Sequence, residues 1–235
     1  MKKPKLFLLH FAGGNRYSFD FLVPYLTNFE VISLELPGRG KRIREDLITE
    51  FDIAAADIYK QITQRLDHES YMLFGHSMGA YMAFKVCSML EKEGIPPSCL
   101  FVSGNAGPGI YADRKRYLYD REKFIEVLKD LGGLPQEVLE NDELLDFVIP
   151  VLRADFELAE RNNLNEYPPV NTPVFAMMGD QEEKSGAINN WKRFTTANFQ
   201  SEILPGGHFF LNDAPQKVAQ LIEDQFKKIA LFQQT

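Results

Sequence analysis

The chain has 235 residues, of which 45% are hydrophobic, and its formal net charge is −7 at pH 7. This length predicts one α/β domain over residues 1–235, and the hydrophobic share predicts a packed core rather than disorder. The negative charge argues against a nucleic-acid-binding protein, because such proteins need a basic face. The two cysteines, Cys87 and Cys99, lie in apolar segments and are interpreted as core residues, not as a disulfide framework.

The sequence contains no segment that predicts contact with a membrane. No apolar run approaches the roughly 20 residues that a membrane-spanning helix needs. The N-terminus, Met1-Lys2-Lys3-Pro4, is basic, but the apolar run at residues 6–9 is too short for a signal peptide. We therefore expect a cytoplasmic protein.

Short apolar runs alternate with longer helical patterns along the chain, which indicates a mostly parallel sheet with helices between its strands. Strands are predicted at residues 5–10, 29–35, 71–74, 99–103, 173–178 and 202–204. Apolar residues four positions apart predict a helix over residues 51–66. A second helix is predicted over residues 78–93, where Gly94 closes it.

The stretch from about residue 107 to residue 164 interrupts this alternation, because it holds helical patterns but no clear strand. Helices are predicted there over residues 122–131, 141–149 and 151–161, and Pro150 separates the last two. Their apolar residues could pack down on the sheet or could form the roof of an apolar substrate pocket. We interpret the stretch as a helical lid insertion. After it, a last helix is predicted to open at Asp213, a residue type that caps helices.

The most informative motif is Gly75-His76-Ser77-Met78-Gly79, a G-x-S-x-G sequence between a predicted strand and a predicted helix. In a strand-turn-helix context, this motif lifts the serine hydroxyl above the end of a parallel sheet, where a substrate can reach it. A serine hydroxyl needs a general base and a third group that orients the base. Ser77 is therefore the candidate nucleophile, and the remaining groups should follow it along the chain.

The general base is predicted from chain order. Of the four histidines, only His208 follows Ser77, and it lies in the glycine-rich segment Pro205-Gly206-Gly207-His208 after the last predicted strand. The other three, His10, His68 and His76, show no ligand spacing of the kind zinc sites use, so neither a metal nor a cofactor is expected. We expect His76 to be a core or supporting residue.

Three carboxylates compete for the third position, because Asp180, Glu182 and Glu183 all follow the predicted strand that ends at Gly179. The usual acid in this arrangement falls three residues after a strand-ending glycine, which favours Glu182. Asp180 is the fallback, and Glu183 is less favoured. Either an aspartate or a glutamate can hold the imidazole tautomer and stabilise the imidazolium.

An oxyanion hole needs two backbone N–H groups. Met78, directly after the nucleophile, should supply one, and Ala12 in the loop Phe11-Ala12-Gly13-Gly14 should supply the other. The glycines in that loop let the backbone approach a substrate closely. A glycine-rich turn without a catalytic part is the alternative interpretation. The loop lacks both G-x-G-x-x-G and G-K-[ST], which argues against a nucleotide site.

Over nearly its whole length the chain resembles the type II thioesterases, stand-alone α/β-hydrolases that serve polyketide and non-ribosomal peptide synthases. The resemblance rests on five segments: Phe11-Ala12-Gly13-Gly14, Pro37-Gly38-Arg39 with Arg42, Gly75-His76-Ser77-Met78-Gly79-Ala80, Leu131-Gly132-Gly133-Leu134-Pro135 followed by residues 149–156, and Pro205-Gly206-Gly207-His208-Phe209-Phe210. The chain departs from the family at Phe11, where histidine is common, and at Glu182, where aspartate is usual.

The resemblance implies an α/β-hydrolase fold and the hydrolysis of acyl groups from the phosphopantetheine thiol of an acyl or peptidyl carrier protein. The implied role is editing, in which stalled or wrong acyl chains are removed, and we expect a monomer. Carrier proteins are generally acidic, so docking needs local basic residues; Lys41-Arg42-Ile43-Arg44 and Arg114-Lys115-Arg116 are the candidates. A small-molecule carboxylesterase and a non-catalytic binding protein on the same fold are the alternatives.

Overall fold

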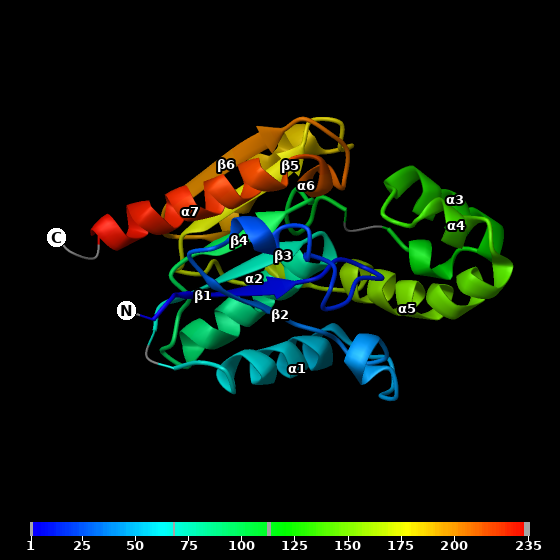
Figure 1. The fold of residues 1–235 in the computed structure, drawn as a ribbon, viewed down its shortest axis with the longest axis horizontal. Helices are drawn as coiled ribbons and strands as arrows, with labels where there is room; N and C mark the ends of the chain where they lie inside the picture. The colour runs from blue at the N-terminus through cyan, green and yellow to red at the C-terminus, as the bar shows by residue number, and fades with distance from the viewer. Residues whose placement is uncertain (1, 68, 112–113, 233–235) are drawn as a thin grey trace.

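Six parallel strands form the central sheet of the computed structural model, which describes residues 2–67, 69–111 and 114–232 (Figure 1). The strand order is β2-β1-β3-β4-β5-β6, and all five pairings are parallel. The strands are β1 (Lys5–Leu9), β2 (Glu30–Ser33), β3 (Tyr71–His76), β4 (Leu100–Ser103), β5 (Val174–Gly179) and β6 (Phe199–Leu204). This arrangement confirms the predicted parallel sheet.

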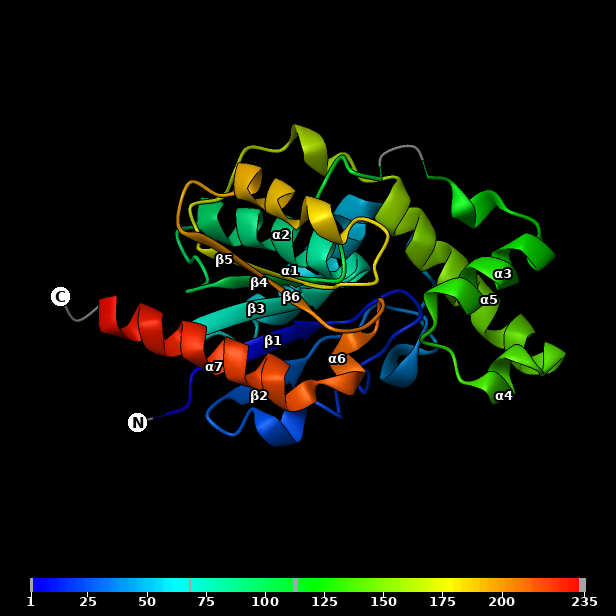
Figure 2. The same cartoon turned by 90° about the horizontal axis from the view of Figure 1, so that it is seen from above.

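Helices cover both faces of the sheet, which explains why its inner strands are continuous apolar runs. Helices α1 (Phe51–Thr63) and α2 (Met78–Lys92) pack on one face, and α7 (Pro215–Phe232) packs on the other (Figure 2). Successive side chains of β1 therefore enter different cores: Phe7 and Leu9 join α1 and α2, while Leu6 and Leu8 join α7. Cys87 and Cys99 are buried free thiols, as predicted.

Helices α3 (Arg121–Leu131), α4 (Gln136–Leu139) and α5 (Asp142–Glu160) lie beyond one end of the sheet (Figure 1). Their buried apolar side chains form a cluster of their own: Phe124, Leu128, Leu145, Ile149, Leu152 and Phe156. Only the last part of α5 joins the main core, through Leu158. These helices therefore pack mostly on one another, and not flat on the sheet.

The prediction of two helices flanking Pro150 was wrong, because α5 runs continuously through the proline. A proline removes one backbone hydrogen bond from a helix and crowds the preceding turn. Pro150 is exposed, whereas Leu145, Ile149 and Leu152 are buried on the opposite side against α3. Burial of that apolar face outweighs the local cost.

The prediction that Asp213 opens the last helix was also wrong. Asp213 ends a separate short helix, α6 (Phe210–Asp213), and α7 begins at Pro215. Burial of Phe210 and Leu211 fixes this extra turn. Short 3-10 segments occupy Val23–Tyr25 (η1), Gly40–Arg42 (η2), Arg116–Leu118 (η3), Leu164–Glu166 (η4) and Ser185–Phe194 (η5). In the described part of the chain, no helix is long and apolar enough to cross a membrane.

Candidate active site

Ser77 sits at the sharp turn between β3 and α2. Its φ of 57° and ψ of −117° make it the one non-glycine residue with a positive φ in the described ranges. Such a conformation costs about 1–3 kcal/mol and persists only where surrounding contacts determine it. Here the Ser77 N–H donates to the Ser103 carbonyl (2.7 Å), and the Asn105 side chain donates to the Ser77 carbonyl (2.8 Å).

Two glycines of the motif are required by the close approach of backbone segments around this turn. A Cβ atom on Gly75 would lie 2.0 Å from the carbonyl oxygen of Gly79, and one on Gly79 would lie 2.2 Å from that of Leu9. The start of α2 is therefore pressed against the ends of β1 and β3. This contact brings Ser77 next to the loop that follows β1.

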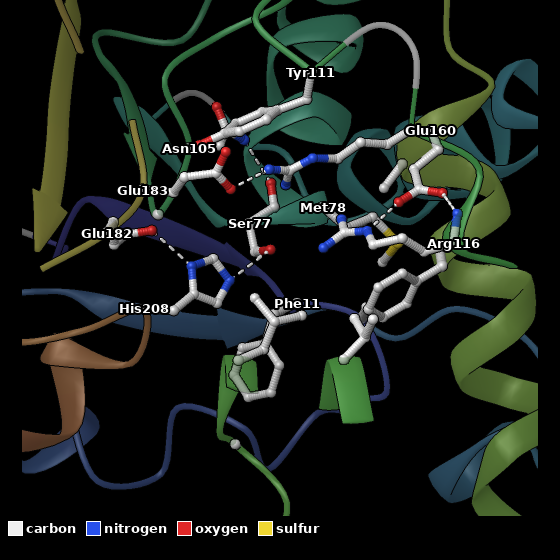
Figure 3. Close-up of a pocket in the computed structure, with 18 of the residues that line it drawn as sticks. Phe11, Ser77, Met78, Asn105, Tyr111, Arg116, Glu160, Glu182, Glu183 and His208 are labelled. Atoms are coloured by element: carbon white, nitrogen blue, oxygen red, sulfur yellow. Dashed lines mark hydrogen bonds and ion pairs between the residues drawn. The ribbon is translucent and has the colours of Figure 1, made fainter. Parts of the chain in front are cut away.

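His208 lies between Ser77 and Glu182 (Figure 3). Its Nε2 is 3.0 Å from the Ser77 hydroxyl, and its Nδ1 is 2.7 Å from a carboxylate oxygen of Glu182. Because an ionised carboxylate can only accept a hydrogen bond, Nδ1 carries the proton and Nε2 is the acceptor for the hydroxyl. This is the arrangement that an activated serine requires.

The three competing carboxylates have three different partners. The second oxygen of Glu182 accepts the Gly179 N–H at the end of β5 (2.8 Å), so both oxygens are used. Asp180 is exposed and accepts the Gly206 N–H (2.9 Å), which braces the loop before His208. Glu183 forms an ion pair with Arg114. Of the three, Glu182 is the one that contacts the imidazole.

Ala12 and Met78 both line the cavity beside Ser77. In the described part of the chain, neither of their backbone N–H groups donates to another protein group. The next two N–H groups of the loop are occupied, because Gly13 donates to Asp155 (2.7 Å) and Gly14 donates to the Phe11 carbonyl (2.9 Å). Of Ala12, Gly13 and Gly14, Ala12 is thus the one whose N–H is left for a ligand.

The hydroxyl of Ser77 opens into a cavity of about 770 Å³, a volume typical of small-molecule sites. Helices α3 and α5 supply apolar lining residues, among them Leu128, Leu152 and Phe156. Of the two alternatives for the insertion, this favours the roof of a pocket. Arg116 also lines the cavity; its backbone N–H and its Nε both donate to the nearly buried Glu160 (Figure 3).

Two of these residues, Arg116 and Asn105, were not predicted from the sequence. Arg116 belongs to a basic run that was considered only as a surface for docking, and its place in the cavity depends on a partner 44 residues away. Asn105 follows β4 and holds the nucleophile turn. Asn105 could have been predicted, because it is a polar residue just after a predicted strand, at the same edge of the sheet as Ser77.

The remaining histidines are buried at the rear of the site, except His68, which lies outside the described residues. His76 is fully buried, and its Nδ1 is 3.0 Å from the Ser103 hydroxyl. Burial, and then the nearby His208, holds the pKa of His76 well below its usual value. Burial, and then Arg39, lowers the pKa of His10 to about 4. Both rings are neutral at pH 7, in keeping with the prediction that His76 is a core or supporting residue.

A parallel sheet with helices on both faces and a serine on a strand-turn-helix bend defines the α/β-hydrolase fold. The model of the thioesterase domain family matches residues 4–226, and the chain belongs to that family. Membership confirms the resemblance found in the sequence.

Individual relatives agree with this assignment. Thioesterase PikA5 of Streptomyces venezuelae is 31% identical over 220 residues, which cover 92% of this chain and 78% of PikA5. The structure of RedJ, a thioesterase from the prodiginine pathway of Streptomyces coelicolor, is 32% identical with a TM-score of 0.87 and covers 96% of this chain and 89% of that chain. The structure of YbtT, a type II thioesterase from the yersiniabactin NRPS/PKS pathway, is 26% identical with a TM-score of 0.88. The match covers 97% of this chain and 94% of YbtT.

Proposed function

We propose that this protein is a type II thioesterase that removes acyl groups from the phosphopantetheine thiol of acyl or peptidyl carrier proteins. Its role would be editing in polyketide or non-ribosomal peptide synthesis. The observation that carries the proposal is the hydrogen-bonded series Ser77, His208 and Glu182 at a cavity, in a chain of the thioesterase family. In this proposal α3 to α5 form the lid of that cavity within a single domain.

In the first half of the reaction, Ser77 attacks the thioester carbonyl carbon while Nε2 of His208 takes the hydroxyl proton. Glu182 stabilises the imidazolium that forms, because its carboxylate accepts from Nδ1 at 2.7 Å. The carbonyl oxygen becomes an oxyanion, which the N–H groups of Met78 and Ala12 would bind. When the tetrahedral intermediate collapses, the carbon–sulfur bond breaks and His208 returns its proton to the departing pantetheine thiolate.

In the second half, a water molecule attacks the acyl-serine ester. His208 takes a proton from that water, and the same two N–H groups bind the second oxyanion. The carbon–oxygen bond to Ser77 then breaks, and His208 returns the proton to the serine oxygen. The net reaction converts a thioester and water to a carboxylic acid and a thiol, and it regenerates the enzyme.

The test compares hydrolysis of an acyl-S-carrier thioester with that of a matched oxygen ester, for the wild type and for Ser77→Ala. The proposal predicts that the wild type cleaves the thioester much faster than the oxygen ester, and that Ser77→Ala cleaves neither while remaining folded by circular dichroism. A preference for the oxygen ester would favour the carboxylesterase alternative. Undiminished thioester hydrolysis by Ser77→Ala would exclude the proposed mechanism.

A further inference from the structure

Asp155, on the lid helix α5, is fully buried and forms an ion pair with the nearly buried Arg39. The pair has two parallel hydrogen bonds, from Arg39 Nη1 to Oδ2 (2.5 Å) and from Nη2 to Oδ1 (2.8 Å). Arg39 comes from the segment after β2, and Asp155 comes from a helix more than a hundred residues later. The pair therefore joins the lid to the body of the sheet.

The ion pair also holds the loop that follows β1. Oδ2 of Asp155 accepts the Gly13 N–H (2.7 Å), and Nη1 of Arg39 donates to the Gly14 carbonyl (3.3 Å). A Cβ atom on Gly13 would lie 2.5 Å from a methyl carbon of Leu152, so the loop backbone rests directly on α5. The loop is fixed from both sides of its turn.

Ala12 lies within this anchored turn. The Gly14 N–H to Phe11 carbonyl bond closes the turn from Phe11 to Gly14, so Ala12 is held between hydrogen-bonded residues. The Gly13 N–H to Asp155 bond ties the same turn to α5. A hydrogen bond to a charged acceptor is roughly twice as strong as one between neutral groups, which suits it to this purpose.

We propose that Asp155 and Arg39 are positioning residues that aim the Ala12 N–H at the developing oxyanion, so that lid helix α5 completes the oxyanion hole. This inference rests on the proposed function, because it concerns the same reaction. Stability alone does not explain the pair, since replacing a buried ion pair by apolar residues is often neutral or stabilising. Geometry does explain it, because a displacement of about 1 Å in an active site can cost about 100-fold in rate.

The test measures kcat, KM and the inhibition constant of an alkyl trifluoromethyl ketone, which forms a tetrahedral oxyanion on the nucleophilic serine. In Asp155→Asn, an amide N–H replaces one carboxylate oxygen and faces a donor on Arg39 or Gly13. We expect kcat to fall about 10- to 100-fold. This is less than the roughly 10³-fold fall in kcat that the complete loss of an oxyanion-hole donor can cause. KM should change less than about threefold, and the ketone should lose affinity by the same factor as kcat/KM.

Arg39→Lys is the second variant, since it keeps the charge but loses the parallel pair of hydrogen bonds. Arg39→Lys should show the same fall in kcat, the same small change in KM and the same loss of affinity for the ketone. If Asp155→Asn does not fold, these three measurements on Arg39→Lys test the inference. Asp57→Asn is the control, because it removes an ion pair from Arg42 in the same segment without touching the loop at Gly13. This control should keep the wild-type kcat and the wild-type affinity for the ketone.

Folded Asp155→Asn or Arg39→Lys protein with wild-type kcat would overturn the inference. A lower kcat with unchanged affinity for the ketone would overturn it as well, because the oxyanion hole would then be intact. These results are distinct from failure of the proposed function, in which the wild type itself would hydrolyse no thioester.

Discussion

At the scale of single residues, the acid of the proposed triad is selected by the turn after β5. Glu182 reaches back to accept the Gly179 N–H with one oxygen and meets His208 with the other. Asp180 points instead to the backbone of Gly206. Chain position predicted this preference for Glu182 over Asp180, and its role in the reaction stays a proposal.

Separate amide substitutions test that role. Glu182→Gln should lower kcat by about 10⁴-fold, because a neutral amide neither stabilises the imidazolium nor enforces the Nδ1–H tautomer. Asp180→Asn keeps a carbonyl oxygen that accepts the Gly206 N–H, so kcat should change little. Steady-state rates on an acyl-pantetheine thioester are the measurement. Equal losses in the two variants, or a larger loss at Asp180, would reassign the acid.

His10 predicts a pH dependence of stability. In the folded protein its Nδ1–H donates to the Phe11 carbonyl (2.8 Å), and its Nε2 accepts the Leu36 N–H (3.4 Å), so protonation removes an acceptor. Because the pKa is about 4 when folded and about 6.5 when unfolded, the unfolded chain binds more protons between these values. The free energy of unfolding should therefore fall by up to about 3 kcal/mol from this group as pH drops from 6.5 to 4.

Urea unfolding of the wild type and His10→Gln at pH 7, 5.5 and 4.5 measures this effect. His76 also lowers the free energy of unfolding as pH falls, since burial lowers its pKa as well. Carboxylates add to the acid sensitivity of both proteins. The variant should lose less stability than the wild type over this range. Identical losses would show that folding does not lower the pKa of His10.

At the scale of elements, α5 shows why the strands were easier to predict than the helices. The buried strands β1, β3 and β5 are apolar runs bounded by polar or glycine residues, so their existence follows from composition. The continuity of α5 depends on Phe124 and Leu128, which lie across the cluster on α3 and balance the cost of Pro150. Because that contact joins residues on different helices, no local sequence pattern predicts it.

The segment η5 was not predicted from the sequence, although its buried residues Ile188, Trp191 and Phe194 recur every three positions, the spacing of a 3-10 helix. Tertiary contacts also hold the segment, because the Trp191 Nε1–H donates to the Asn105 carbonyl (3.0 Å). Ser77, His208 and Glu182 could be located from chain order because the fold fixes which loops meet. The pairing of Arg39 with Asp155 could not, because it depends on how α5 packs against the segment after β2.

The start of α5 gives a prediction for this element. The Asn141 side chain accepts the Leu144 N–H (3.1 Å) and caps the helix. Asn141→Ala should lower the free energy of unfolding by about 1 kcal/mol, whereas Asn141→Asp should retain the cap and most of the stability. Urea unfolding measures both. A loss as large in the aspartate variant as in the alanine variant would contradict the capping role.

At the scale of the whole molecule, the net charge of −7 opposes the approach of an acidic carrier protein. Of the two basic runs, Arg114 and Arg116 line the cavity and pair with Glu183 and Glu160. In the other run, Arg42 pairs with Glu45 and Asp57. Lys41 and Arg44 are exposed, and they are the cations that we propose for docking. The segment that contains η2 (Gly40–Arg42) lies toward the end of the molecule that carries α3 to α5 (Figures 1 and 2).

Charge reversal tests this docking surface. Lys41→Glu/Arg44→Glu should raise KM for an acyl-carrier substrate about 10-fold or more at low salt, because electrostatic attraction aids association. Hydrolysis of a small acyl-pantetheine should be unchanged. The control is Lys227→Glu/Lys228→Glu, which makes the same charge change on exposed positions near the far end of α7. An equal effect from both double variants would show that only net charge matters.

Active-site labelling tests whether one hydroxyl, activated by one imidazole, cleaves the thioester. An alkyl fluorophosphonate is titrated against the protein, and the modified residue is identified by peptide mass spectrometry while thioester hydrolysis is followed in parallel. We expect one label per chain, located on Ser77, and a loss of hydrolysis in proportion to labelling. Labelling of His208→Ala should be very slow. Full hydrolysis by completely labelled protein, or a label at another residue that alone abolishes activity, would contradict it.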